Sequence, residues 1–226
     1  MHIEPEVVTG AKLFLSYATA AGAFGLTAKL ALDSIRSNGG ISALALRSLL
    51  TTALVFCFFE VFPHQAVGVS EVHLILGSTL LLLFGAGATA VGLSLGLLLQ
   101  GLLFAQFDLP QYGMNVTTLL VPLWGISLLA KRIIAPGTAY VDLSYKQALA
   151  LSTAYQGGIV AWVAFWAVYG NGFSGENLAA VGSFGLAYMS VILIEPLVDL
   201  GVLAAAKAFS GYSRGPLFNT RLHQPA

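Results

Sequence analysis

The chain has 226 residues, of which 57% are hydrophobic and 9% are charged, and its formal net charge is zero. Soluble domains carry about 25% charged residues, so most of this chain does not face water. The zero net charge gives no electrostatic case for nucleic acid as a partner. The single cysteine, Cys57, excludes an internal disulfide and a thiolate-rich zinc site. Composition therefore predicts a polytopic helical membrane protein of the all-α class.

About seven apolar segments are long enough to cross a membrane, for which a helix needs about 20 mostly apolar residues. The run 72–107 is too long for one helix, and we expect it to divide near Gly85-Ala86-Gly87. Pro196 predicts a kink in the last segment. The expected spans are 12–32, 43–62, the two halves of 72–107, 115–130, 147–169 and 178–206.

Basic residues indicate the orientation, because Lys and Arg favour the cytoplasmic side of a membrane. With the N-terminus extracytoplasmic and the C-terminus cytoplasmic, Lys12 alone stays near the outer side. All the other basic residues then lie inside or at the cytoplasmic ends of helices: Lys29, Arg36, Arg47, Lys131, Arg132, Lys146, Lys207, Arg214 and Arg221. We therefore expect a multi-pass protein of the cell (inner) membrane, embedded in the lipid bilayer, with this orientation.

The first residues can bind a metal ion without help from a fold, because His2 stands next to the α-amino group. Amine, backbone amide and imidazole can close on one ion. The chain continues with Glu4, Pro5 and Glu6 and has no basic segment before an apolar stretch. We therefore do not expect a cleaved signal peptide. A large residue at position 2 is also expected to protect Met1 from removal.

A second imidazole, His73, lies at the outer end of the third expected span. The Met1 amine, the His2 amide nitrogen and the imidazoles of His2 and His73 would form a planar set of four nitrogens. Such a set suits Ni(II) or Cu(II) and is tolerated by Co(II). The amine must lose its proton, so binding should weaken in acid. The alternative is that His73 is an interfacial or packing residue.

Other polar residues of the outer side leave alternatives open. His64 is a competing ligand or an ordinary loop residue, and Asn115 either anchors the inserted terminus or caps a helix. The outer face carries imidazoles and carboxylates but almost no cations, which is typical of a mouth that collects cations. For Glu4, Glu6 and Glu176 the alternative is that loops are simply polar.

Two further patterns lie within the spans. Ala88, Gly92 and Gly96 recur every four residues and form a face for close helix contact, either internal or with a partner subunit. Glu195 and Asp199 share a helix face, and charges inside a membrane should be paired or neutral. We expect an ion pair with Lys29 and Arg47, whereas the functional alternative is a proton or ion path.

Four stretches carry a resemblance to a known family: Met1-His2-Ile3, residues 70–77, residues 96–104 and Gly113-Met114-Asn115. In their order and spacing the chain resembles the CbiM/NikM family, the substrate-specific membrane component of energy-coupling-factor (ECF) cobalt and nickel importers. The resemblance covers nearly the whole chain. It departs from the family pattern at Glu4-Pro5-Glu6, at Glu71-Val72 and in the loop 107–112.

The resemblance implies that Met1, His2 and His73 hold Ni2+ or Co2+ as transported substrate, with no permanently bound cofactor. Asn115 would support the inserted segment, with Ser70, Glu71 and His64 as neighbours or alternative ligands; Glu71 near the ion would favour Co(II). One transmembrane substrate-binding domain is expected over 1–226, with a metal-binding segment 1–11 and a cytoplasmic tail 207–226. The implied partners are a transmembrane coupling subunit and ATPase subunits, with room for a small accessory membrane subunit.

Functions from other classes have less support in the sequence. Gly172-Phe173-Ser174-Gly175 resembles the serine motif of rhomboid proteases, but the needed base is missing, because the only later histidine, His223, lies on the wrong side. No His-Glu-x-x-His pattern supports a metalloprotease. An ion-conducting or assembly subunit that uses Glu195 and Asp199 is the remaining alternative. We expect the chain not to be an enzyme.

Overall fold

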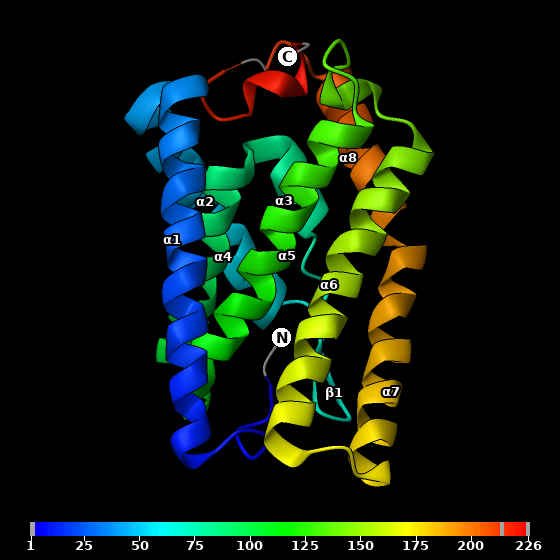
Figure 1. The fold of residues 1–226 in the computed structure, drawn as a ribbon. Coiled ribbons are helices and arrows are strands. Elements are labelled where there is room, and N and C mark those ends of the chain that lie inside the picture. Colours follow the sequence, from blue (N-terminus) through cyan, green and yellow to red (C-terminus); the bar gives the residue numbers. More distant parts are fainter. Residues whose placement is uncertain (1–2, 213–214, 225–226) are drawn as a thin grey trace.

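The computed structural model describes residues 3–212 and 215–224. Eight α-helices and one short β-hairpin make up this part of the chain, linked by 3-10 turns (Figure 1). The helices are α1 (Leu13–Ser37), α2 (Gly40–Glu60), α3 (Gly77–Phe84), α4 (Ala86–Leu103), α5 (Tyr112–Ile133), α6 (Tyr145–Asn171), α7 (Gly175–Met189) and α8 (Glu195–Ala208). The hairpin consists of β1 (Gln65–Val67) and β2 (Ser70–Val72), paired antiparallel.

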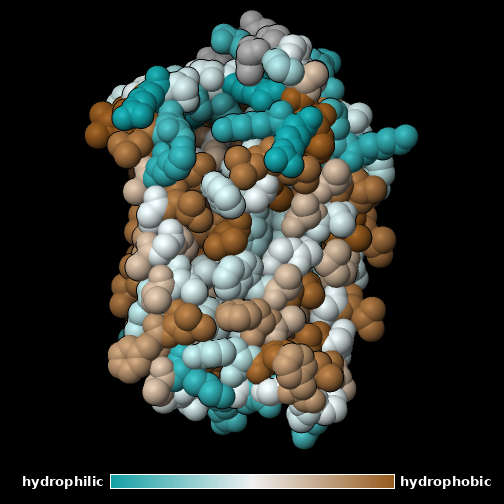
Figure 2. All heavy atoms as spheres, in the orientation of Figure 1, coloured by the Kyte–Doolittle hydropathy of each residue, from teal (hydrophilic) through white to brown (hydrophobic). Residues whose placement is uncertain are grey.

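Six helical stretches of the described residues are long and apolar enough to cross a membrane. They are Gly10–Ser37, Gly40–Glu60, Ala86–Leu103, Gln106–Ile133, Tyr145–Asn171 and Gly175–Ala208. The middle of the face in Figure 2 is neutral or hydrophobic, with hydrophobic side chains along its two sides, whereas strongly hydrophilic ones gather toward its two ends. The protein is thus a polytopic helical membrane protein.

The expected third span corresponds to the segment that leads from the hairpin into α3, and only its second half is helical; α3, with eight residues, is not one of the six stretches. Residues 73–76 have no regular structure, whereas a helix through the whole third span was expected. Leu76 has a left-handed backbone, with φ of 55°, directly before α3. Non-helical backbone at membrane depth is tolerated where protein buries it, and His73, Ile75 and Leu76 are all buried.

The start of α1 and the 3-10 turn Thr220–Leu222 lie at opposite ends of the bundle (Figure 1). Following the predicted orientation, we call the end with Lys12 and the loop before α7 the outer end. The end with Arg36, α8's last turn and the 3-10 turn Thr220–Leu222 is called the cytoplasmic end.

Both expected helix breaks are present. Gly85, with φ of 83°, separates α3 from α4. Pro196 lies in the first turn of α8, after the 3-10 turn Ser190–Leu193. Proline is tolerated there because the first turn of a helix has no intrahelical acceptor for its N–H groups. The last crossing is therefore two helices joined at the predicted kink.

The row of small residues in α4 packs inside the molecule, against α2. A Cβ added at Gly92 would lie 2.2 Å from Thr51 Oγ1, and one added at Gly96 would lie 2.6 Å from Val55 Cγ1. The Thr51 hydroxyl also donates to the Ala88 carbonyl at 2.8 Å. The close contact that the spacing predicted is therefore between two helices of the same chain.

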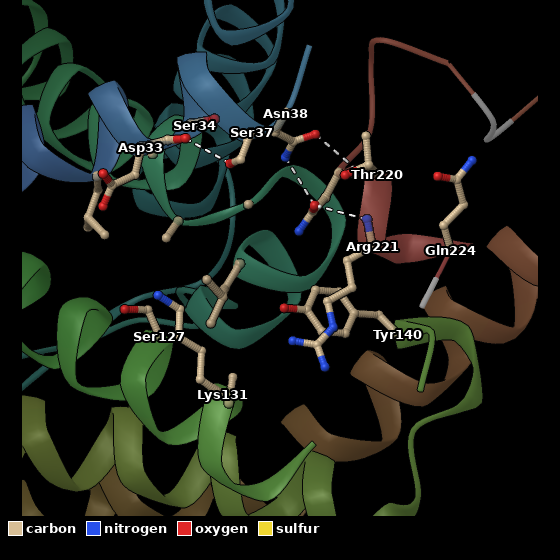
Figure 3. Close-up of a pocket in the computed structure, with 17 residues that line it drawn as sticks. Asp33, Ser34, Ser37, Asn38, Ser127, Lys131, Tyr140, Thr220, Arg221 and Gln224 are labelled. Carbon is tan, nitrogen blue, oxygen red and sulfur yellow. Dashed lines mark hydrogen bonds between the residues drawn. The ribbon is translucent and has the colours of Figure 1, made fainter. Parts of the chain in front are cut away.

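The C-terminal residues cover the cytoplasmic end of the bundle, beside a pocket of about 370 Å³ (Figure 3). The Asn219 amide donates to the Leu83 carbonyl at 2.7 Å. Arg221 donates to the carbonyls of Ile134 and Ala135, and its guanidinium lies 5.0 Å from the Tyr140 ring centre. Burial raises the pKa of Tyr140 above its usual value, and Arg221 offsets part of this effect.

The α2–α4 contact predicts a stability difference between two glycine substitutions. Gly92→Ala places a methyl group against Thr51, and overpacking of this kind costs about 1–3 kcal/mol. Gly22→Ala, on the exposed side of α1 with nothing within 4 Å, is the matched control and should leave stability unchanged or slightly higher. Thermal unfolding in detergent measures both, and equal melting temperatures for the two variants would contradict the packing role.

Candidate metal centre

The N-terminal segment is inserted into the bundle. Ile3 is 0% exposed and forms an antiparallel bridge with Ser70, at the start of β2. The Ile3 amide donates to Asn115 Oδ1 at 3.0 Å, across 112 residues of sequence. Further along, Gln111 Nε2 donates to the Pro5 carbonyl at 2.9 Å. Contacts from the hairpin and from the beginning of α5 thus hold the first described residues in the core.

Asn115 is buried within the first turns of α5 and does not cap that helix, whose N-cap is Gln111. Its side-chain oxygen accepts the Ile3 amide instead. Of the two roles considered for Asn115, the observed contact corresponds to anchoring. Gly113, two residues before Asn115, lets α1 approach closely, since an added Cβ would lie 2.9 Å from the Ser16 carbonyl oxygen.

His73 is 1% exposed and follows β2 directly. Its Nε2 lies 3.0 Å from Glu71 Oε2. The His64 ring stacks on it at 5.0 Å between centroids, and the Phe59 ring of α2 meets it edge-on at 5.1 Å. The hairpin therefore brings Glu71 and His73 together, and the loop before β1 lays His64 over them.

Met1 and His2 lie outside the described residues. Of the other expected residues, Ser70, Glu71, His73, His64 and Asn115 all lie around Ile3 or around His73. Across residues 3–212 and 215–224 no group of three His, Cys, Asp or Glu side chains is arranged to hold a metal ion.

An outer pocket of about 770 Å³ lies beside the inserted segment and is lined by Glu4, Glu6 and Glu176, among others. The nearby Lys12 directs its ammonium to the Gly170 carbonyl at 2.7 Å. Three carboxylates around one pocket raise the local concentration of cations. The acidic character expected of the outer face is thus concentrated at one place next to residues 4–7.

The expected ion pairs of Glu195 and Asp199 are wrong. Lys29 pairs with Asp33 on the surface of α1, at 2.8 Å. Arg47 donates to backbone carbonyls, among them Ala43 and Phe84. The physical reason is the arrangement of the helices: α8 packs against α3 and α6, away from the α1 and α2 positions of the two basic residues.

The true partners of the two carboxylates are hydroxyl and amide groups that sequence reasoning missed. They are Ser78, Thr79, Ser152 and Gln156. A signal was present in the sequence, because Ser152 and Gln156 are four residues apart on one helix face and Ser78-Thr79 interrupts an apolar run.

The Asn115 contact predicts loss of order in the terminal segment when its acceptor is removed. Asn115→Leu leaves the buried Ile3 amide without its acceptor, which costs about 1–3 kcal/mol and should speed hydrogen exchange of residues 3–8 about ten- to hundredfold. Thr118→Val is the control, because that buried hydroxyl bonds only within α5. Exchange mass spectrometry distinguishes the variants, and unchanged exchange in Asn115→Leu would show that Asn115 does not hold the segment.

The outer pocket predicts an effect on the rate of ion capture. Replacing Glu4, Glu6 and Glu176 together by Gln should slow association of a divalent cation about tenfold at low salt, because electrostatic steering is lost. The difference should shrink at high salt. Asp142→Asn, at the opposite end, is the control. Stopped-flow association of Co2+ measures the rates, and a salt-independent difference would rule out steering.

The sequence was also compared with known proteins. No curated protein and no solved structure matches the chain. Residues 2–211 match the family described as the cobalt uptake substrate-specific transmembrane region, CbiM. That match covers the inserted segment, the hairpin and all eight helices. The chain therefore belongs to the CbiM family of cobalt uptake membrane components.

Proposed function

We propose that this protein captures Co2+ or Ni2+ at the outer end of the bundle and delivers it inward, as the substrate-specific component of an ECF-type importer. The observation that carries the proposal is the insertion of the N-terminal segment, with Ile3 fully buried beside Ser70 and its amide on Asn115. A terminal segment with a histidine next to the α-amino group is a chelator, and the burial of Ile3 would bring that chelator into the protein.

The proposed ligands are the Met1 amine, the His2 amide and imidazole nitrogens, and the His73 imidazole. The antiparallel bridge between Ile3 and Ser70 supports this set. Antiparallel chains run in opposite directions, so residues that continued the bridge before Ile3 would extend toward the same side as the chain after Ser70, which leads to His73. Four nitrogens suit Ni(II) and are tolerated by Co(II).

Glu71 and His64 would shape the site without being its main ligands. Glu71 Oε2 lies 3.0 Å from His73 Nε2, an arrangement that holds the proton on Nε2 and presents Nδ1 to an ion. His64 is exposed and stacks on the His73 ring, so it covers the site from the outer side. Since the Glu71 carboxylate is engaged with His73, the geometry supports a nitrogen-dominated site.

Energy would come from other subunits. The chain has no phosphate-binding loop of the Gly-rich, Lys-Ser/Thr kind. We therefore assign ATP hydrolysis to ATPase subunits that act through a transmembrane coupling subunit, with room for a small accessory membrane subunit in the complex. The serine considered for a hydrolase, Ser174, caps α7 by accepting the Asn177 amide at 3.2 Å.

The ligand set predicts the effect of three histidine substitutions. His2→Ala and His73→Ala should each abolish tight one-to-one binding of Ni2+ and Co2+, because each removes an imidazole from a four-nitrogen site. His223→Ala, at the cytoplasmic end, should bind like the native protein. Isothermal titration of protein with an untagged N-terminus measures all three. Unchanged binding in His2→Ala would remove the terminus from the site.

The same set predicts the pH dependence. The α-amino group, with a pKa of about 7.7–8.0, must lose its proton to bind, so affinity should be full above this range and fall as pH decreases below it. Titration with Ni2+ between pH 6 and pH 8.5 tests this, with the acetylated N-terminus as control. Affinity independent of pH would exclude the amine as a ligand.

A further inference from the structure

A second cluster of ionisable groups lies deeper in the bundle, on the cytoplasmic side of His73. Glu195 and Asp199 are both 0% exposed and stand one turn apart on α8. They face Ser78 and Thr79 of α3 and Ser152 and Gln156 of α6, which hydrogen-bond to them. The outer site proposed above does not use this cluster.

The cluster contains negative charge without a basic partner. Among the described residues no Lys, Arg or His side chain bonds to Glu195 or Asp199. Lys207, on the same helix, pairs with Asp142 at 2.6 Å. Burying two carboxylates without a countercharge is costly in a protein interior. A cation of some kind is therefore needed for both groups to be ionised.

The Ser78 hydroxyl contacts two carboxyl groups but has one hydrogen, so its contacts show where a proton or cation is needed. The Ser78 hydroxyl lies 3.2 Å from Glu195 Oε1 and 2.8 Å from Asp199 Oδ2. One hydroxyl carries one hydrogen, so it can donate fully to only one of them. The second contact requires a proton on a carboxyl group or a cation beside it. In the ion-free protein one proton, shared between Glu195 and Ser78, satisfies this count.

Further buried oxygens around the carboxylates have unused capacity. Gln156 donates its Nε2 to Glu195 Oε2 at 2.5 Å, so its amide is directed into the cluster, yet its Oε1 has no hydrogen-bond partner in the described part of the chain. The same is true of the hydroxyl of Tyr155, the residue before Gln156 on α6, and of the Tyr188 hydroxyl. All three residues are 0% exposed. A proton shared between Glu195 and Ser78 leaves Gln156 Oε1 without a partner, whereas a cation held by the carboxylates can take it as a ligand.

One short segment connects the two sites. His73 and Ser78 are five residues apart, so they can lie at most about 18 Å from each other. Between them Leu76 has the left-handed backbone, and a Cβ added at Gly77 would lie 2.2 Å from the Tyr155 ring. A change in backbone at this point would move a ligand of the outer site and the hydroxyl between the two carboxylates together.

We propose that Glu195 and Asp199, with the oxygens of Ser78, Ser152 and Gln156, form an inner cation site that receives the divalent ion after it leaves the outer site. This inference rests on the proposed transport function. The two carboxylates match the charge of a divalent ion. An all-oxygen site binds Co2+ or Ni2+ less tightly than imidazole and amine nitrogens do, so it can take the ion and still release it. Binding displaces the shared proton.

The test uses the full-length protein in lipid nanodiscs, with Co2+ and Mn2+ as probes. Native protein should bind two Co2+, the second at least tenfold more weakly. Glu195→Gln combined with Asp199→Asn keeps the side-chain shapes and should lose the second Co2+ while keeping the first. In His2→Ala, Mn2+, which prefers oxygen ligands, should still bind once by electron paramagnetic resonance, and the added double substitution should abolish that signal.

Asp142→Asn is the matched control, because it removes an exposed carboxylate at the cytoplasmic end, and it should leave both binding events unchanged. If the double variant melts at a lower temperature than the native protein by more than a few degrees, Glu195→Gln alone is used, and it should weaken the second Co2+ at least tenfold. Equal Co2+ stoichiometry in native and substituted protein, or unchanged Mn2+ binding, would overturn the inner site and leave a proton as its occupant. If His2→Ala still binds two Co2+ with native affinities, the outer site alone would be overturned.

Discussion

Non-helical backbone inside a membrane protein has to find its hydrogen-bond partners within the protein, and much of this structure follows from that constraint. The segment from β1 to Leu76 is such backbone. It is paired partly with itself, in the hairpin, and partly with the inserted N-terminal residues through the Ile3–Ser70 bridge. Asn115 supplies the acceptor that the Ile3 amide still needs. The insertion of the N-terminal segment and the interruption of the expected third span are thus two parts of one arrangement.

The same interruption determines where chemistry can occur. In a regular helix through residues 72–84, the directions of the His73 and Ser78 side chains would follow from the helical period alone. The irregular segment instead places His73 beside Glu71, His64 and Phe59, and it places Ser78 between two carboxylates of α8. Membership of the CbiM family gives cobalt uptake as the setting for these two groups. In that setting, nitrogen ligands near the outer end and oxygen ligands nearer the cytoplasm would form an order of decreasing affinity.

Sequence reasoning could predict the features that depend on local patterns. Apolar length located the spans, Gly85 and Pro196 marked the breaks, and the four-residue spacing of Gly92 and Gly96 predicted a close helix contact. It could not predict which helix meets which. The partners of Glu195 depend on the packing of α8 against α3 and α6. The basic residues that were expected to pair with it, Lys29 and Arg47, belong instead to α1 and α2. The irregular segment 73–76 escaped detection because its residues are as apolar as those of a helix.

The contact between Ile3 and Asn115 also has a consequence for the order of assembly. The two residues are separated by 112 positions, and α1, α2, the hairpin, α3 and α4 lie between them in the chain. Loop closure over such a distance waits for the intervening chain, and synthesis proceeds from the N-terminus at about 5–20 residues per second. Ile3 therefore reaches its final position only after these five elements have been synthesised. Until then the Asn115 side-chain oxygen lacks the Ile3 amide as its donor.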